Sequence, residues 1–545
     1  MATSSPPPYS ESKELEPTSL RKDARNQKQL GFFTWFCVLL STVSAMLMGY
    51  DIGIMSSAIL FIQEELNLSL FEEEVIVGSL NLFAAVGSLG AGFIANFLGR
   101  RKALLISSAL FLVGAVILAA SVNFGWLVVG RLLTGLGVGF AMMIAPLYSA
   151  EISPATVRGF LVSFTEVFVN VGILLGYVIG FAFQFLSSAY NWRLMLGAGA
   201  LPAIFLAVGA LFVLPESPRW LVLQGRNEEA KHVLIDVVCG KDEVEAQQRL
   251  EEIITANEEE GGGAGCGCFS GGTKKSSNSS SGKSPLGSFL SDLRRFLTSP
   301  LARMYVIAIG VNFFQQASGI DALVYYSPVV FKQAGVHDKI GKLGATVGMG
   351  VVKLAFVFVA TYLLDHVGRK KLLYVSASGV IACLTTVAVT FVLLGLNSAK
   401  GDSLIGVSDQ KAETARSSAA GEAVTIAAIL AYVAFFSVGF GPISYVLTSE
   451  IFPLRHRSTA VGVSVFVNRA VSGTVALTFL SIAKAITPAG IFGLFAGITT
   501  VSLLFVWLMV PETKGRTLED IAHLFASSSH QGEGSRDVEL APATK

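Results

Sequence analysis

Hydrophobic residues occur in long, nearly uninterrupted runs along most of the chain, and short polar segments separate these runs. A run of about 20 apolar residues is long enough to cross the hydrocarbon core of a bilayer as a helix. Twelve runs of this kind can be counted, at about 33–60, 75–97, 103–121, 126–149, 160–182, 193–214, 303–331, 343–364, 372–395, 421–447, 459–483 and 489–510. The pattern therefore predicts an all-α membrane protein with twelve transmembrane helices.

The polar segments divide the chain into five parts. Within the longest polar segment, residues 227–257 are charged and predict short amphipathic helices, whereas the Gly/Ser-rich tract 261–284 predicts disorder. The predicted parts are an N-terminal cytoplasmic tail (1–30), a six-helix bundle (31–214), a cytoplasmic loop with short helices (215–302), a second six-helix bundle (303–510) and a C-terminal cytoplasmic tail (511–545).

Short motifs in the first six runs return at the equivalent places in the last six. The recurring pairs are Gly99–Lys102 with Gly368–Lys371, Ser149–Pro154 with Ser449–Pro453, and Pro215–Arg219 with Pro511–Arg516. Repetition of this kind predicts two pseudo-symmetric halves, and parallel halves in a membrane enclose a site at their interface. A transporter is the natural interpretation.

The distribution of Lys and Arg predicts the orientation of the chain. Positive residues gather in alternate loops and in both tails, whereas the loop after the first run contains Glu64, Glu65 and Glu72–Glu74 and no Lys or Arg. Because cytoplasmic loops carry the excess of positive charge, both termini are predicted to be cytoplasmic. The outer loop also contains Asn67-Leu68-Ser69, a weak glycosylation acceptor close to the membrane.

The composition agrees with a membrane protein and excludes several other classes. The chain is 52% hydrophobic and only 14% charged, whereas soluble domains carry about 25% charged residues. A net charge of +1 gives no indication of a nucleic-acid partner. The five cysteines show no disulfide or zinc spacing, and no nucleophile–base set is visible, so neither a metal, a cofactor nor an enzyme is expected.

Asp51 places a carboxylate inside the first apolar run, where a charge costs about 2.5–3.5 kcal/mol on insertion scales. At 1.5 Å per residue it lies about 27 Å from Phe33, in the outer half of the membrane. By the same count Arg131 lies about 8 Å beyond Trp126, at a matching depth, and can supply the counter-charge. Such pairs usually mark ion pathways, which favours a role in ion coupling over the alternative of a static salt bridge.

Four further ionisable residues lie deep in the predicted bundle: Glu166, Asp321, Lys353 and Arg469. With Asp51 and Arg131 they make three acids and three bases. A balanced set of this kind predicts a connected polar cavity, because each charge alone would be costly in the membrane.

Glutamates and arginines also recur at the predicted cytoplasmic ends of both halves. Glu151 and Glu450 are expected to pair with arginines of the loops after the second and eighth runs and to hold the halves shut on the inside. The alternative is that the arginines only set the topology. The predicted cytoplasmic gate comprises Arg100, Glu151, Arg158, Glu216, Arg369, Glu450, Arg457 and Glu512.

The repeated Gly-Arg loops, Pro215–Trp220, Gln315–Ile320 and Pro511–Gly515 resemble the motifs of the sugar porter family of the major facilitator superfamily. The resemblance covers about residues 30–525 and is strongest to the plant polyol/monosaccharide proton symporters. It implies alternating access by a rocker-switch movement, with hexoses or linear polyols as substrates and the proton as coupling ion.

The resemblance also assigns roles to single positions. In the proton symporters of the family, the residue at the position of Asp51 carries the transported proton. The residue at the position of Arg131 modulates the binding of that proton. Glu166 stands where sugar porters usually have a Gln that binds substrate. Asp321 and Lys353 stand where the hexose carriers have Asn. These differences match the polyol transporters rather than the hexose carriers. Tyr325 and Tyr326 match the outer gate. The implied substrate-binding set is Glu166, Gln315, Gln316, Asp321, Tyr325, Tyr326, Lys353, Gly441, Tyr445 and Asn468.

Together these features predict a proton-coupled symporter of polyols, monosaccharides or both. It is expected to function as a monomer in the plasma membrane, with the vacuolar membrane as the alternative. A uniporter for the same substrates is the nearest rival. A non-transporting sugar sensor is an alternative of another class. The long cytoplasmic loop suggests a sensor, whereas the short C-terminal tail argues against it.

Overall fold

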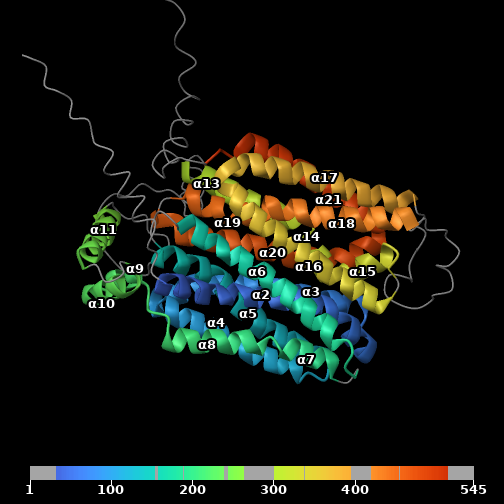
Figure 1. Ribbon diagram of the computed structural model, residues 1–545, viewed down its shortest axis with the longest axis horizontal. Coiled ribbons are helices and arrows are strands. Elements are labelled where there is room, and N and C mark those ends of the chain that lie inside the picture. The colour runs from blue at the N-terminus through green and yellow to red at the C-terminus, as the bar shows by residue number, and fades with distance from the viewer. Residues whose placement is uncertain are drawn as a thin grey trace, which may run out of the picture.

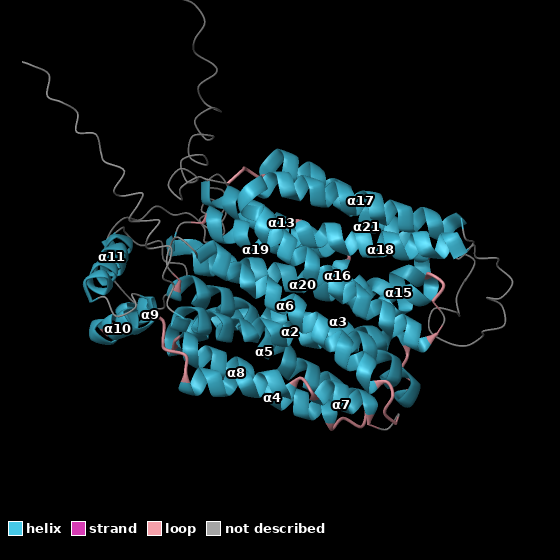
Figure 2. Cartoon of the chain, in the orientation of Figure 1, coloured by secondary structure: helices cyan, strands magenta, loops and turns pink. Residues whose placement is uncertain are grey.

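The computed structural model describes residues 32–153, 158–187, 190–238, 243–262, 300–336, 338–393, 419–452 and 454–513. All regular elements in these ranges are helices (Figure 2). The long helices lie side by side along one direction, as expected for chains that cross a bilayer repeatedly (Figure 1).

The N-terminal half supplies the helices drawn from blue to green in Figure 1. Its helices are α2 (Phe32–Leu66), α3 (Leu70–Leu98), α4 (Arg100–Ala119), α5 (Phe124–Ile152), α6 (Arg158–Phe183), α7 (Asn191–Gly197) and α8 (Ala200–Phe212).

The C-terminal half follows the same plan, in yellow to red (Figure 1). Its helices are α13 (Pro300–Ala317), α14 (Ile320–Tyr325), α15 (Ser327–Gln333), α16 (Lys339–Val367), α17 (Arg369–Leu393), α18 (Ala419–Val438), α19 (Phe440–Ile451), α20 (Leu454–Ile486) and α21 (Pro488–Met509). The two halves meet where α3 packs along α20 and where α6 packs along α16.

Short helices of the segment between the halves gather at one end of the bundle (Figure 1). They are α9 (Pro218–Leu223), α10 (Asn227–Val233), a π-helix (Leu234–Val238) and α11 (Glu243–Gly262). We call this end of the bundle the insertion end, and the end that holds α15 and the turn between α2 and α3 the opposite end.

Among the described residues, 11 helices are long and apolar enough to cross a membrane. The seventh predicted span, 303–331, is missing from that count because its polar residues lower its mean hydropathy. In the structure this span is divided into α13, α14 and α15. Gly319 ends the first piece with φ 88°, a left-handed conformation that glycine adopts without steric cost. Ser327 and Pro328 begin the third piece, and proline is well suited to a first helical turn.

The outer loop predicted after the first span is shorter than expected. Helix α2 continues to Leu66 and α3 begins at Leu70, so Glu64, Glu65 and Glu72–Glu74 belong to helices and not to a loop. Ser69 and Glu72 cap α3 reciprocally, which explains its early start. Asn67 lies exposed in the remaining turn.

Glycines let α2 and α6 pack closely. A methyl group added to Gly49 would overlap the backbone carbonyl of Val169, and one added to Gly172 would overlap the carbonyl of Met46. Small residues allow this approach in membranes, where the lipid supplies no hydrophobic force between helices. The contact fixes α2, the helix that carries Asp51.

Candidate functional site

Asp51 on α2 and Arg131 on α5 form a buried ion pair. The Arg131 guanidinium donates to Asp51 Oδ2, and the two side chains are 3% and 1% exposed. A second Arg131 nitrogen donates to Met55 Sδ, whereas its Nε has no partner in the described part of the chain. The pairing predicted from depth along the two helices is therefore present.

Amide side chains from α13 and α20 form a cluster between the helices of the C-terminal half. Asn468 Nδ2 donates to Gln315 Oε1 at 2.7 Å and to Asn312 Oδ1 at 3.2 Å. Gln315 Nε2 donates in turn to the carbonyl of Gly441 at 3.3 Å. Three of the predicted substrate-binding positions are thus in direct contact.

Next to these amides lies a second buried ion pair, between Asp321 of α14 and Arg469 of α20 at 3.6 Å. Ser472 donates to the same Asp321 oxygen at 2.5 Å. In the amide orientation that satisfies both of its polar atoms, Gln316 donates to Asp321 at 3.0 Å and accepts from Arg469 at 2.7 Å. These contacts connect the charge pair to the amide cluster.

Asn81 of α3 joins this C-terminal cluster to the N-terminal half. Its Nδ2 donates to Ser472 Oγ at 2.9 Å and to the hydroxyl of Tyr325 at 3.2 Å, and its Oδ1 accepts from Arg469 at 3.4 Å. Asn81 and Ser472 are completely buried. Neither residue was predicted from the sequence, although Asn81 is a polar residue within an apolar run, and that signal could have identified it.

Glu166 of α6 and Lys353 of α16 lie close enough to influence each other electrostatically without forming an ion pair. Asn170 donates to Glu166 Oε1 at 3.2 Å. Lys353 is 6% exposed and, within the described residues, its ammonium makes no hydrogen bond. Tyr445 lies within electrostatic reach of Glu166. The structure thus brings these three predicted positions into one neighbourhood.

The two tyrosines of the predicted outer gate have different surroundings. Tyr325 contacts the other half through Asn81, whereas Tyr326 donates to the carbonyl of Ala476 at 3.1 Å, within its own half. The ring of Tyr326 stacks on Phe479 with a centroid separation of 5.3 Å.

Two further hydrogen bonds join the halves beside these tyrosines. Ser56 and Ser327 lie 3.0 Å apart, and Tyr177 donates to the carbonyl of Val324 at 3.0 Å. The opposite end of the bundle is therefore closed by direct contacts between α2, α3 and α6 on one side and α14, α15 and α20 on the other.

At the insertion end the N-terminal half carries a compact charge network. Arg100 forms an ion pair with Glu151 at 2.8 Å. Glu216 accepts from the backbone N–H groups of Arg100 at 2.7 Å and Arg101 at 3.2 Å, at the start of α4. A carboxylate at a helix N-terminus is favourable because it meets free N–H groups and the positive end of the helix dipole.

The C-terminal half repeats this network. Arg369 pairs with Glu450 at 2.8 Å, and Glu512 accepts from the backbone N–H groups of Arg369 at 3.0 Å and Lys370 at 3.1 Å.

Glu151 and Glu450 pair with arginines of the loops after the second and eighth runs, as predicted, but these pairs do not join the two halves to each other as expected. Each of them joins helices of one half, because Glu151 and Glu450 each end a span that packs beside the loop of its own half. The side chains of Arg158 and Arg457 lie outside the described residues.

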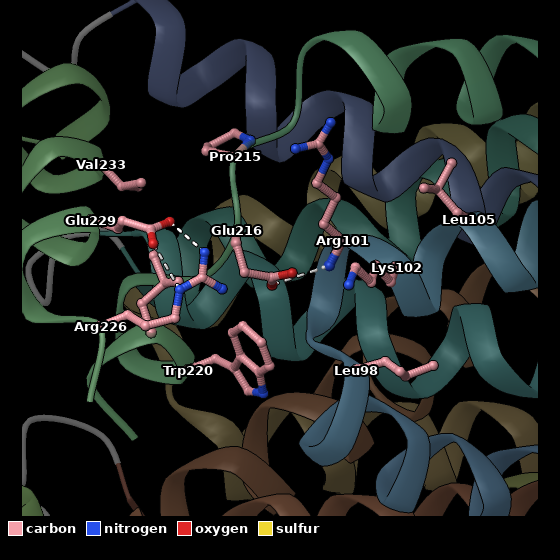
Figure 3. Close-up of a pocket in the computed structure, with 11 residues that line it drawn as sticks. Leu98, Arg101, Lys102, Leu105, Pro215, Glu216, Trp220, Arg226, Glu229 and Val233 are labelled. Atoms are coloured by element: carbon pink, nitrogen blue, oxygen red, sulfur yellow. Dashed lines mark hydrogen bonds and ion pairs between the residues drawn. The ribbon is translucent and has the colours of Figure 1, made fainter. Parts of the chain in front are cut away.

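A pocket of about 560 Å³ lies beside this network, between the start of α4 and the helices α9 and α10 (Figure 3). Arg226 and Glu229 form an exposed ion pair at its rim, 2.6 Å apart. Trp220 donates to the carbonyl of Asn96 at 2.9 Å. The pocket lies at the insertion end and contains none of the predicted substrate-binding residues.

Two repeated groups of membrane-spanning helices, with charges buried between them, define a secondary transporter. A family model described as "Sugar (and other) transporter" matches residues 36–525. The chain belongs to this family, and is accordingly a multi-pass membrane transporter and not an enzyme.

Relatives agree with this assignment. The chain is 42% identical over 494 residues to "Polyol transporter 5" of Arabidopsis thaliana, covering 91% of this chain and 86% of the relative. Among solved structures it resembles the proton:xylose symporter XylE bound to 6-bromo-6-deoxy-D-glucose, with a TM-score of 0.71, 26% identity and 91% and 100% of the two chains covered. The partially occluded inward open conformation of XylE from E. coli matches with a TM-score of 0.70, 26% identity and 90% and 100% of the chains covered. The predicted fold, twelve spans in two pseudo-symmetric halves, is confirmed.

Proposed function

We propose that this protein is a proton-coupled symporter that moves polyols, monosaccharides or both across a membrane by alternating access. The observation that carries the proposal is the buried Asp51–Arg131 pair, which provides a titratable group with a counter-charge inside the bundle. A polyol transporter among its relatives and a proton:xylose symporter among its structural neighbours support the substrate class and the coupling ion.

The orientation follows from the positive loops, which place the insertion end in the cytoplasm and the opposite end outside. With that orientation the hydrogen bonds between the halves at Asn81, Ser56 and Tyr177 lie on the outer side. The structure then corresponds to a state closed to the outside. We place the protein in the plasma membrane, with both termini in the cytoplasm.

Asp51 is proposed to bind the transported proton. When the site is open to an acidic exterior, Asp51 takes up a proton, loses its attraction to Arg131, and leaves α2 free to move over bound substrate. On the neutral cytoplasmic side Arg131 favours the ionised carboxylate, so the proton is released. A proton is bound on one side and released on the other in each cycle.

The substrate is proposed to bind at the amide cluster and the charges beside it. A polyol presents many hydroxyl groups, each able to donate and to accept, and requires a site with both kinds of partner. Gln315, Gln316 and Asn468 offer both, Glu166 accepts, and Lys353 donates. Since Lys353 has no hydrogen bond in the described part of the chain, a substrate hydroxyl would supply one.

The two charge networks at the insertion end are proposed to act as a cytoplasmic gate by stiffening each half. Arg100–Glu151 and Arg369–Glu450 tie the ends of spans within one half, so that each half moves as one body when the inside opens.

The function is tested with the full-length protein in proteoliposomes. An inwardly directed proton gradient should drive accumulation of a labelled polyol above its outside concentration, and a protonophore should abolish accumulation without stopping exchange. Uptake that stops when the inside and outside concentrations are equal, and that is indifferent to the protonophore, would identify a uniporter. The absence of uptake for every member of a polyol and hexose panel would favour a sensor.

A further inference from the structure

Two adjacent carboxyl groups at the outer end of α3 are not used by the proposed transport site. Glu73 and Glu74 are each only 2% exposed, although the sequence placed them in a solvated loop. Their neighbour Glu72 caps the helix together with Ser69 and is less buried. The structure therefore buries a carboxyl pair between the halves at the outer end.

Glu74 forms a contact between the two halves. Its Oε1 accepts from the backbone N–H of Ser481 at 2.7 Å, and its Oε2 accepts from the Ser481 hydroxyl at 2.5 Å. Ser481 belongs to α20, so this contact exists only while α3 and α20 are together at their outer ends. Opening to the outside would separate them and expose both carboxyl groups to water.

Glu73 has no comparable partner. Its Oε2 is buried and accepts no hydrogen bond within the described residues. Its titratable neighbours are Glu74 on its own helix and Tyr326 at the start of α15. The hydroxyl of Tyr326 donates to the carbonyl of Ala476, so it is not directed at Glu73.

Within the described residues, the other elements around α3 bring no cation that forms an ion pair with Glu73 or Glu74. On α2, Glu64 and Glu65 are paired with Lys339 and Arg193 respectively. On α5, Arg131 is held by Asp51. On α20, Lys484 lies one turn beyond Ser481, is exposed, and forms no ion pair with either carboxylate among the described contacts. The charged residues that the elements around α3 bring, with their own ion-pair partners, are thus Glu64, Glu65, Lys339, Arg193, Arg131, Asp51 and Lys484.

Two carboxylates buried side by side without a cation repel each other, and each also loses its hydration. Protonation of one of them removes both penalties. Glu74 accepts two hydrogen bonds from Ser481, whereas Glu73 Oε2 accepts none within the described residues, so Glu73 is the group that takes the proton.

We propose that Glu73 is a second proton-binding residue of the transport cycle. It takes a proton from the outer solution when the outer end closes, and returns it to the same side when that end opens. The inference rests on the alternating-access cycle proposed above. Because Glu73 does not face the cytoplasm, this proton is not transported and the coupling ratio set by Asp51 is unchanged. External acid then favours closure of the outer end.

The size of the effect follows from linkage. If closing takes up one proton, the ratio of closed to open molecules changes by at most about tenfold per pH unit. Asp51 titrates in the same cycle, so the measurement uses the Asp51→Asn background, where the pH dependence that remains belongs to other groups.

The test measures the distance between spin labels at the outer ends of α3 and α20 in purified full-length protein without substrate. In the Asp51→Asn protein the open fraction should rise several-fold from acid to alkaline pH. Adding Glu73→Gln should remove this dependence and leave the protein closed, because the amide is neutral at every pH. Glu72→Gln, one residue earlier on the same helix, is the matched control and should retain the dependence.

An equal pH dependence with and without Glu73→Gln would overturn the proposal, and so would an open fraction that does not change with pH in the parent. If Glu73→Gln does not fold, the infrared carbonyl band of a protonated carboxyl group provides a second measurement. That band should be present in the closed parent protein and should weaken as the outer end opens; its absence would overturn the proposal. Neither the spin-label distance nor the infrared band depends on polyol transport. If polyols are not the substrate, or if Asp51 does not couple transport to protons, the uptake experiments would show this independently of the test of Glu73.

Discussion

Arg131 and Asp51 are paired within the N-terminal half, and both lie within electrostatic reach of Tyr325, which belongs to the C-terminal half. Tyr325 accepts a hydrogen bond from Asn81 at the contact that closes the opposite end of the bundle. The proposed proton site and the predicted outer gate are thus neighbours. A change of charge at Asp51 acts directly on the residue that joins the halves, and no long pathway through the protein is needed.

Asp51→Asn should separate substrate movement from proton movement. The amide keeps the size of the carboxylate and removes its charge, so exchange of labelled polyol at equal concentrations should continue. Accumulation driven by a pH gradient should be lost, and the internal concentration should only equal the external one. Uptake and exchange in the same proteoliposomes measure the two quantities.

Glu65→Gln is a suitable control for that experiment, because Glu65 lies on the same helix but pairs with Arg193 at the end of α2. This variant should accumulate polyol normally. Normal pH-driven accumulation by Asp51→Asn would show that the Asp51–Arg131 pair is only structural.

Arg131→Gln should destabilise the protein in a pH-dependent manner. Removing one partner of a buried pair leaves an uncompensated charge and costs roughly 3–5 kcal/mol. That cost is present when Asp51 is ionised and falls as acid protonates it. The denaturation temperature of Arg131→Gln should therefore approach that of the wild type on acidification, as measured by thermal unfolding in detergent.

Two comparisons make the result specific. The double variant Asp51→Asn/Arg131→Gln carries no buried charge at this site and should regain much of the lost stability. Arg193→Gln breaks a partly exposed pair and should cost less than about 1 kcal/mol. A stability deficit in Arg131→Gln that is independent of pH would assign the loss to packing instead.

The sequence predicted those parts of the structure that depend on one residue and its depth in the membrane. Asp51 and Arg131 could be paired because each lies at a countable distance along a regular helix. Asp321 and Arg469 were recognised as buried charges, but their pairing depends on where α14 meets α20, after the break at Gly319, and a helical count cannot follow the chain through a break.

Glu73 and Glu74 were misplaced for a different physical reason. A run of three glutamates is typical of a solvated loop, and local composition does not show that α20 covers two of them. Asn81 was overlooked because one amide in an apolar span is usually packing between helices. Only the meeting of the two halves makes it a partner of Arg469, Ser472 and Tyr325.

Asp321 and Arg469 should behave as a coupled pair in a double-mutant cycle. Asp321→Asn leaves Arg469 buried without its carboxylate, and Arg469→Gln leaves Asp321 with only its neutral donors, Ser472 and Gln316. The double variant removes both charges, so its stability loss should be smaller than the sum of the single losses. Residues in contact show coupling energies of about 0.5–3 kcal/mol, which thermal unfolding can measure.

Arg226 and Glu229 provide the reference pair for that cycle. They are in contact at 2.6 Å but exposed, so their coupling should not exceed a few tenths of a kcal/mol. A coupling between Asp321 and Arg469 as small as this would mean that the buried contact is not formed in the membrane.

The packing of α2 on α6 yields a prediction that is independent of charge. Gly49→Ala places a methyl group against the carbonyl of Val169, and α2 must move away from α6 to accept it. Overpacking of this kind costs roughly 1–3 kcal/mol. Because α2 carries Asp51, the same displacement should weaken the Asp51–Arg131 contact, so that the coupling ratio falls together with the denaturation temperature.

The matched control is Gly90→Ala on α3, where an added methyl group meets no atom within 4 Å and should change neither quantity. Equal behaviour of the two variants would show that the close approach of α2 and α6 is not required.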